Sequence, residues 1–118
     1  MTLSASQAVG YGAEEKAARF LAARGLAIVA RNFRTRLGEI DLVARDGATL
    51  VFVEVRYRAG KGYGGAVESI TAAKRSRLVA AANQYLGALG AEPPCRFDVV
   101  TVDGDSAQWI RAAFDVAG

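Results

Sequence analysis

Histidine is absent from this chain of 118 residues, and cysteine occurs once, as Cys95. Without histidine the chain cannot form a Ser-His-Asp or Cys-His triad, a histidine-ligated zinc site, or a nuclease site with a histidine base. One cysteine excludes an intramolecular disulfide, and its apolar and proline neighbours predict a small buried or half-buried side chain. Any catalysis must therefore use carboxylates with a metal ion, or lysine and arginine.

Long apolar runs are also missing, because charged residues interrupt each of them well short of a bilayer span. The first residues have neither the basic nor the apolar region of a secretory signal. We therefore expect no membrane association and a cytoplasmic location. Hydrophobic residues make up 52% of the chain, and no repeat or biased tract is visible. This composition predicts one globular domain over residues 1–118, with a core from about residue 8 to about residue 115.

Lysine is scarce, so arginine supplies most of the positive charge in a chain whose formal net charge is +3. Arginine suits bidentate recognition of phosphate groups. A mild positive excess is also common on surfaces that bind no nucleic acid, so the charge alone leaves both interpretations open.

The hydrophobic pattern predicts two helices and five strands in the order αβββαββ. The helices are expected from about Ser6 to Arg24 and from a Thr71 cap to about Leu89, and the strands at Leu26–Ala30, Glu39–Ala44, Leu50–Tyr57, Arg96–Val102 and Gln108–Phe114. The basic segment Arg31–Arg36 is expected to continue as an exposed strand or a loop. This order indicates an α/β fold with a mixed sheet between helices.

Two neighbouring strands place acidic residues close together. Asp46-Gly47 is a hairpin signal, so Glu39–Ala44 and Leu50–Tyr57 should pair antiparallel. A turn of two or four residues would bring Asp41 opposite Glu54 or onto its diagonal, within about 5 to 8 Å, whereas an odd turn would not. Strand alternation puts two sets of side chains on opposite faces. We expect an apolar face of Ile40, Leu42, Val51, Val53 and Val55, and a polar face of Glu39, Asp41, Glu54 and Arg56.

Adjacent carboxylates repel each other unless positive charge lies between them. The pair therefore predicts either a site for a divalent metal or a solvated hairpin neutralised by Arg34, Arg36 and Arg56. A metal held by oxygen ligands beside a cationic side chain is what assisted phosphodiester hydrolysis needs. Such a nuclease site requires both carboxylates to emerge into an open cleft that accepts a cation.

The string from Gly38 to Val43, followed by Phe52-Val53-Glu54-Val55-Arg56, resembles the D…(D/E)xK core of the PD-(D/E)XK nuclease superfamily. More closely, the chain from about Gly10 to Phe114 resembles the YraN family, small bacterial proteins grouped with that superfamily and related in fold to archaeal Holliday-junction resolvases. Further matching segments are Ala17–Leu21, Arg31–Arg34, Thr71 with Lys74, Arg96–Val100 and Ala113-Phe114.

The resemblance implies a three-layer fold like that of restriction endonucleases, with Mg²⁺ or Mn²⁺ held by Asp41 and Glu54. Glu14 on the first helix would be a further acidic catalytic residue, although a glutamate early in a helix is also favoured by the helix dipole. The chain departs from the motif at Arg56, which stands where the motif has lysine. As a catalytic residue Arg56 could contact a phosphate or stabilise charge in the transition state, but it cannot release a proton near neutral pH. Lys74 or Lys61 would supply an ammonium group if the fold brought either one close. A milder departure is Ala13, where the family has a second glycine.

The leading hypothesis is a metal-dependent endonuclease acting on DNA, including branched or flapped DNA. Nucleic acid would lie on a basic surface, although a solvated helix face explains Arg75 and Arg77 equally well. The residues expected on that surface are Arg31, Arg34, Arg36, Arg58, Lys61, Lys74, Arg75 and Arg77. Arg56 motivates the alternative, an inactive nuclease scaffold that binds nucleic acid or serves as a protein adaptor. The sequence leaves the oligomeric state open, including a homodimer.

Overall fold

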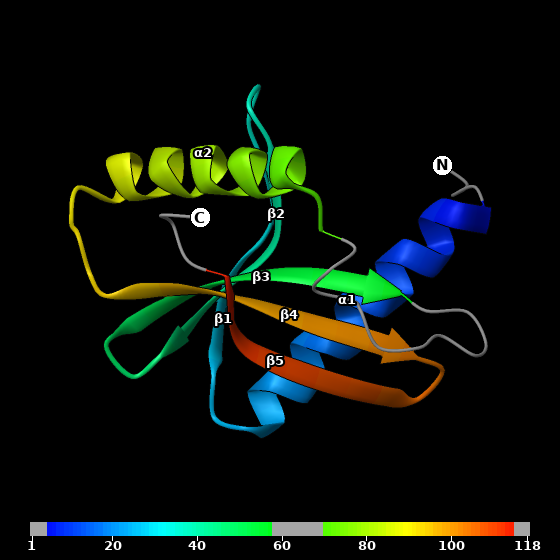
Figure 1. Cartoon of the computed structure of the whole chain (residues 1–118). Coiled ribbons are helices and arrows are strands. Elements are labelled where there is room, and N and C mark those ends of the chain that lie inside the picture. Colours follow the sequence, from blue (N-terminus) through cyan, green and yellow to red (C-terminus); the bar gives the residue numbers. More distant parts are fainter. Residues whose placement is uncertain (1–4, 58–69, 115–118) are drawn as a thin grey trace.

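The chain folds as three layers, in which a five-stranded sheet lies between two helices (Figure 1). The computed structural model describes residues 5–57 and 70–114, with side chains from residue 12 onward. Its elements are α1 (Ala5–Ala23), β1 (Ala27–Arg34), β2 (Glu39–Asp46), β3 (Thr49–Tyr57), α2 (Ala72–Leu89), β4 (Cys95–Asp103) and β5 (Ser106–Phe114). This is the αβββαββ order that the sequence predicts. No helix within the described part of the chain is long and apolar enough to cross a bilayer.

The sheet has the strand order β1-β2-β3-β4-β5 and is mixed. β3 and β4 are parallel because α2 returns the chain across the sheet, and the other neighbours pair antiparallel. The β2–β3 turn contains two residues, Gly47 and Ala48, with Asp46 paired to Thr49 and Gly47 at a φ of 61°. An even turn is the condition under which Asp41 falls beside Glu54.

The two helices cover opposite faces of the sheet, each over its own hydrophobic cluster (Figure 1). α1 buries Ala13, Ala17 and Leu21 against one face. α2 buries Leu78, Ala81 and Ala82 against the other. The Thr71 side chain accepts the Lys74 N–H at 3.1 Å and so caps the start of α2, while Gly90 ends the helix in the left-handed conformation.

Two sequence predictions about side chains are wrong. Ile40 does not share a face with Leu42 but packs in the α2 cluster with its cross-strand partner Phe33. The β1–β2 hairpin rises past α2 (Figure 1), so the simple alternation of faces fails near the end of the hairpin. Cys95 is exposed because it is the first residue of β4, before the part of that strand that enters the core.

Candidate active site

Asp41 and Glu54 lie beside each other where β2 and β3 separate. The β2–β3 register ends at Leu42 opposite Val53, and these two acids follow in the next position outward. There the Asp41 carboxylate, through Oδ2, accepts the Val55 N–H at 2.8 Å. This hydrogen bond fixes Asp41 next to β3, and the two carboxyl groups lie within hydrogen-bonding distance.

Glu54 is buried, in contrast to the open position that the nuclease hypothesis required. Its exposed fraction is 5%, whereas Asp41 is half-buried. Glu54 Oε2 lies 3.4 Å from Arg56 Nε and 3.6 Å from Lys74 Nζ on the first turn of α2. Glu54 Oε1 is buried and has no hydrogen-bond partner among the described residues. The adjacency of the pair is therefore as predicted, but the openness of Glu54 is not, because Phe52 and Glu54 both lie on the face that α2 covers.

Burial sets the protonation of the pair. The pKa of Glu54 is raised from 4.5 to about 7, mainly by burial and then by the negative charge of Asp41, against the opposing charges of Lys74 and Arg56. Burial also raises the pKa of Asp41, opposed by the Val55 N–H. Two neighbouring carboxyl groups with raised pKa values share a proton more readily than they carry two negative charges.

Glu14 on α1 lies near this pair without completing a cluster of three acids. Burial raises the pKa of Glu14, and the charge of Asp41 adds to the rise. Within the described residues, however, no three acidic or cysteine side chains are close enough together to hold a metal ion. Asp41 and Glu54 are the described carboxylates that could share a divalent cation, with water supplying the remaining oxygen ligands.

Asn32 is a residue of this region that the sequence reasoning missed. Its φ of 51° lies in the left-handed region, and its side chain hydrogen-bonds to Glu14. A non-glycine residue with positive φ is uncommon, and asparagine tolerates this conformation better than most. The available signal was an asparagine within an otherwise strand-forming segment.

The basic residues predicted from the sequence do not all lie near the carboxylate pair of Asp41 and Glu54. Lys74 and Arg56 contact Glu54. Arg34 lies 3.4 Å from Glu39 on the same hairpin. Arg31 instead contacts Glu15 of α1 at 2.9 Å, where its charge is partly neutralised. Of the predicted basic surface, the structure therefore brings Lys74 to the carboxylate pair, beside Arg56, and it pairs Arg31 and Arg34 with other acids.

The remaining predicted cations lie on α2, at the β1–β2 turn or outside the described residues. Arg75 has its guanidinium 5.6 Å from the centre of the Phe114 ring. Arg77 and Arg36 are exposed. Arg58 and Lys61 fall outside the described residues. Among the described members of the predicted basic surface, Arg36 and Arg77 are exposed and make no ion pair with another described residue.

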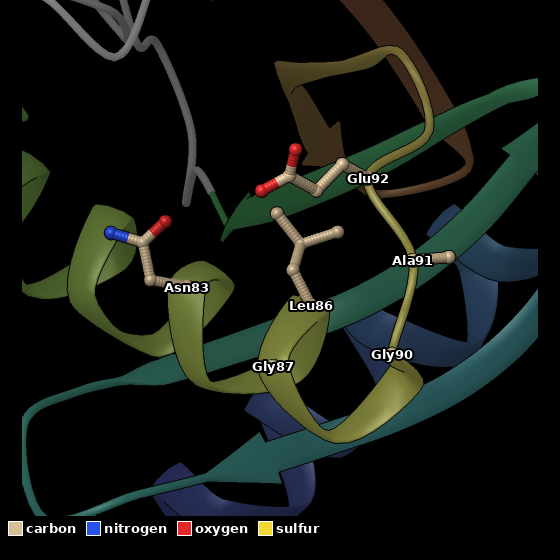
Figure 2. A pocket seen from close by; sticks show the side chains of 6 residues that line it. All are labelled: Asn83, Leu86, Gly87, Gly90, Ala91 and Glu92. Carbon is tan, nitrogen blue, oxygen red and sulfur yellow. The ribbon is translucent and has the colours of Figure 1, made fainter.

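A hollow of about 590 Å³ lies at the opposite end of α2 (Figure 2). Its lining residues are Asn83, Leu86, Gly87, Gly90, Ala91 and Glu92. Glu92 is the one titratable group among them, so this lining offers neither paired carboxylates nor a cation. The carboxylate pair beneath the first turn of α2 is therefore the better candidate for chemistry.

Comparison with known proteins identifies the family. Residues 13–102 match the model of the uncharacterised protein family UPF0102. The chain is 54% identical over 114 residues to a UPF0102 protein of Ralstonia nicotianae, covering 92% of this chain and 88% of the relative. It is 56% identical over 106 residues to one of Dechloromonas aromatica, covering 89% and 87%. The chain therefore belongs to the UPF0102 family, which is the YraN family that its sequence resembles.

Proposed function

We propose that the chain is a divalent-metal-dependent phosphodiesterase that acts on DNA, with Asp41 and Glu54 as the metal ligands. The observation that carries the proposal is the close pair of carboxyl groups, in which Glu54 Oε1 is buried and has no N–H or hydroxyl partner among the described residues. A buried polar atom without a partner costs free energy. The residues fit a hard cation such as Mg²⁺ or Mn²⁺, which would satisfy this oxygen and relieve the repulsion between the two acids.

The protein side chains have separate roles in this proposal. A bound divalent cation would supply Lewis acidity and would activate a water molecule. Asp41, oriented by the Val55 N–H, would be the ligand nearer to solvent, and Glu54 would be the buried ligand. Lys74 provides a positive charge that a phosphate oxygen can contact. It would take the role of the motif lysine, which Arg56 replaces in this chain.

The burial of Glu54 does not meet the condition drawn from the sequence, that both carboxylates emerge into an open cleft, so the proposal depends instead on the closeness of the two carboxyl groups. A shared cation needs two carboxyl groups close together, and Asp41 and Glu54 provide them even though Glu54 is buried. Catalytic carboxylates are commonly desolvated, because burial is what shifts their pKa values. Substrate would therefore approach from the side of Asp41, which is half-buried.

The test measures cleavage of labelled linear, flapped and four-way-junction DNA with Mn²⁺. We expect Asp41→Asn and Glu54→Gln each to lower the rate at least about 100-fold, since loss of a ligand removes several kcal/mol of charge stabilisation. Asp103→Asn, an exposed acid at the end of β4, is the matched control and should cleave like wild type. Equal cleavage by all four proteins would identify a contaminating nuclease and reject the proposal.

A second candidate function is binding of nucleic acid without cleavage. It is favoured by the two cations that already contact Glu54, because they neutralise the acid without a metal. Here DNA binding would be sensitive to salt, independent of Mn²⁺, and unchanged or stronger after Asp41→Asn. Failure of DNA or RNA to bind at low salt would reject both candidates and favour a protein adaptor.

A further inference from the structure

The turn between β1 and β2 has a well-defined conformation. Thr35 N donates to Gly38 O at 2.8 Å, and the Thr35 hydroxyl donates to the same oxygen at 2.9 Å. The N–H groups of Leu37 and Gly38 both donate to Thr35 Oγ1 at 3.0 Å. Four hydrogen bonds within four residues hold the tip of the hairpin in one shape.

The base of this turn is packed tightly against α2. Gly38 is buried, and a Cβ atom there would lie 2.2 Å from the carbonyl oxygen of Arg77. Only glycine permits so close an approach of the two main chains. The tip is therefore supported by α2 as well as by its own hydrogen bonds, and it extends past the helix (Figure 1).

The side chains at the tip are exposed despite this rigidity. Leu37 is 53% exposed, the highest value among the exposed large hydrophobic residues of the described chain. Arg36 beside it is also exposed. A cation next to an apolar side chain on a rigid support fits a partner that offers a phosphate and an apolar surface together.

Positive charge makes DNA the appropriate partner for this surface. Arg77, which contributes the carbonyl that braces Gly38, is itself exposed on α2. One helical turn earlier on α2, Lys74 lies over the carboxylate pair. The tip and the proposed catalytic site are thus joined by a single stretch of helix, so DNA bound at one can extend to the other.

We propose that Arg36 and Leu37 form a wedge that recognises duplex DNA where base stacking is interrupted. Arg36 contacts a phosphate, and Leu37 packs against the exposed face of a base pair, as apolar wedges do when they enter a base step. A continuous duplex must be unstacked first, whereas a gap already exposes a base pair. This inference rests on the proposed function, because it names the form of DNA presented to the carboxylate site.

The experiment measures fluorescence anisotropy of a labelled duplex with a one-nucleotide gap and of the same duplex without the gap. Both are titrated in EDTA, so binding is observed without cleavage. We expect wild type to prefer the gapped duplex at least about tenfold, corresponding to about 1.4 kcal/mol. Leu37→Ser should bring this ratio close to one, and Leu37→Met should keep it. Arg36→Ala should weaken binding to both duplexes and reduce the salt dependence.

The matched control is Leu89→Ser, which makes the same change at a leucine 44% exposed at the far end of α2. This variant should retain the preference of wild type. The proposal that Arg36 and Leu37 form a wedge is wrong if wild type shows no preference for the gapped duplex, or if Leu37→Ser keeps that preference undiminished. A preference for the gapped duplex without any cleavage in Mn²⁺ would support the wedge and reject only the phosphodiesterase activity, so the two failures are distinguishable.

Discussion

Two buried carboxylates on adjacent, parallel strands have opposite environments. Asp98 on β4 is fully buried and accepts hydrogen bonds from Arg96 Nε at 3.0 and 3.1 Å, from Trp109 Nε1 at 2.9 Å and from the Ala112 N–H at 2.9 Å. Glu54 on β3 is 5% exposed, yet its Oε1 has no partner among the described residues. Both strands place a charge in the core, and only one of these charges is fully satisfied.

The difference indicates different roles. The Asp98 carboxylate fixes the fold, because it ties β4 to a β5 residue, Ala112, whose φ is 49° and which lies where the β4–β5 register shifts. Arg96 extends this network to Asp46 at 2.9 Å. Glu54 leaves an oxygen without an N–H or hydroxyl partner among the described residues, as a ligand position does. Stability should therefore depend on Asp98, and metal binding on Glu54.

Asp98→Asn should produce the largest change in stability. The amide removes the charge that Arg96 faces and cannot accept all the hydrogen bonds made by the carboxylate. We expect the free energy of unfolding to fall by about 3 kcal/mol. Urea denaturation at neutral pH measures it, with Asp103→Asn as the exposed control on the same strand. A loss no greater than that of the control would show that the Asp98 carboxylate does not stabilise the fold.

Glu54→Gln should raise the free energy of unfolding above neutral pH, whereas Asp98→Asn lowers it. The pKa of Glu54 is raised to about 7 in the folded state, so the folded protein binds this proton more tightly than the unfolded chain does. Its contribution to stability is full below about pH 4.5 and is lost as the pH rises to about 7. Glutamine has no such pH dependence, so above pH 7 the variant should be more stable by on the order of 1 to 3 kcal/mol.

Urea denaturation of wild type and Glu54→Gln at several pH values gives this difference directly. The difference should grow between about pH 4.5 and about pH 7 and then level off. A constant difference, or a variant that is less stable at pH 8, would mean that Glu54 is a satisfied structural charge like Asp98.

Of these three substitutions, Lys74→Met should change the free energy of unfolding least. Lys74 lowers the pKa of Glu54, so its removal should move the pH dependence of stability to higher pH. The Lys74 side chain is 39% exposed, and solvent screening should hold the change in unfolding free energy under about 1 kcal/mol. Lys16→Met, which removes a surface contact with Asp105, is the control and should not move that pH dependence. No movement in either variant would show that Lys74 does not act on Glu54.

Local sequence signals were sufficient for most of the fold. The Asp46-Gly47 signal predicted the hairpin, and its two-residue turn, one of the even lengths that the sequence left open, set the register that brings Asp41 to Glu54. The Thr71 cap and the end of α2 at about Leu89 were likewise predictable from residue type. These features depend on neighbours a few residues apart, which is why the sequence could predict them.

Features that depend on distant contacts could not be predicted. Asp98 takes hydrogen bonds from residues 11 and 14 positions later, and nothing near it in the chain signals that arrangement. The burial of Glu54 follows from the placement of α2 over its face of the sheet. The sequence named Lys74 as one of two lysines that could reach the site, and packing of α2 on the sheet brought it there.

The central claim is that the bare oxygen of Glu54 is a metal ligand, and isothermal titration calorimetry with Mn²⁺ tests it most directly. The titration is made at pH 8, above the pKa of Glu54. We expect wild type and Asp103→Asn to bind one ion per chain, and Glu54→Gln and Asp41→Asn to show no binding heat. Absence of binding by wild type, or equal binding by Glu54→Gln, would contradict the claim.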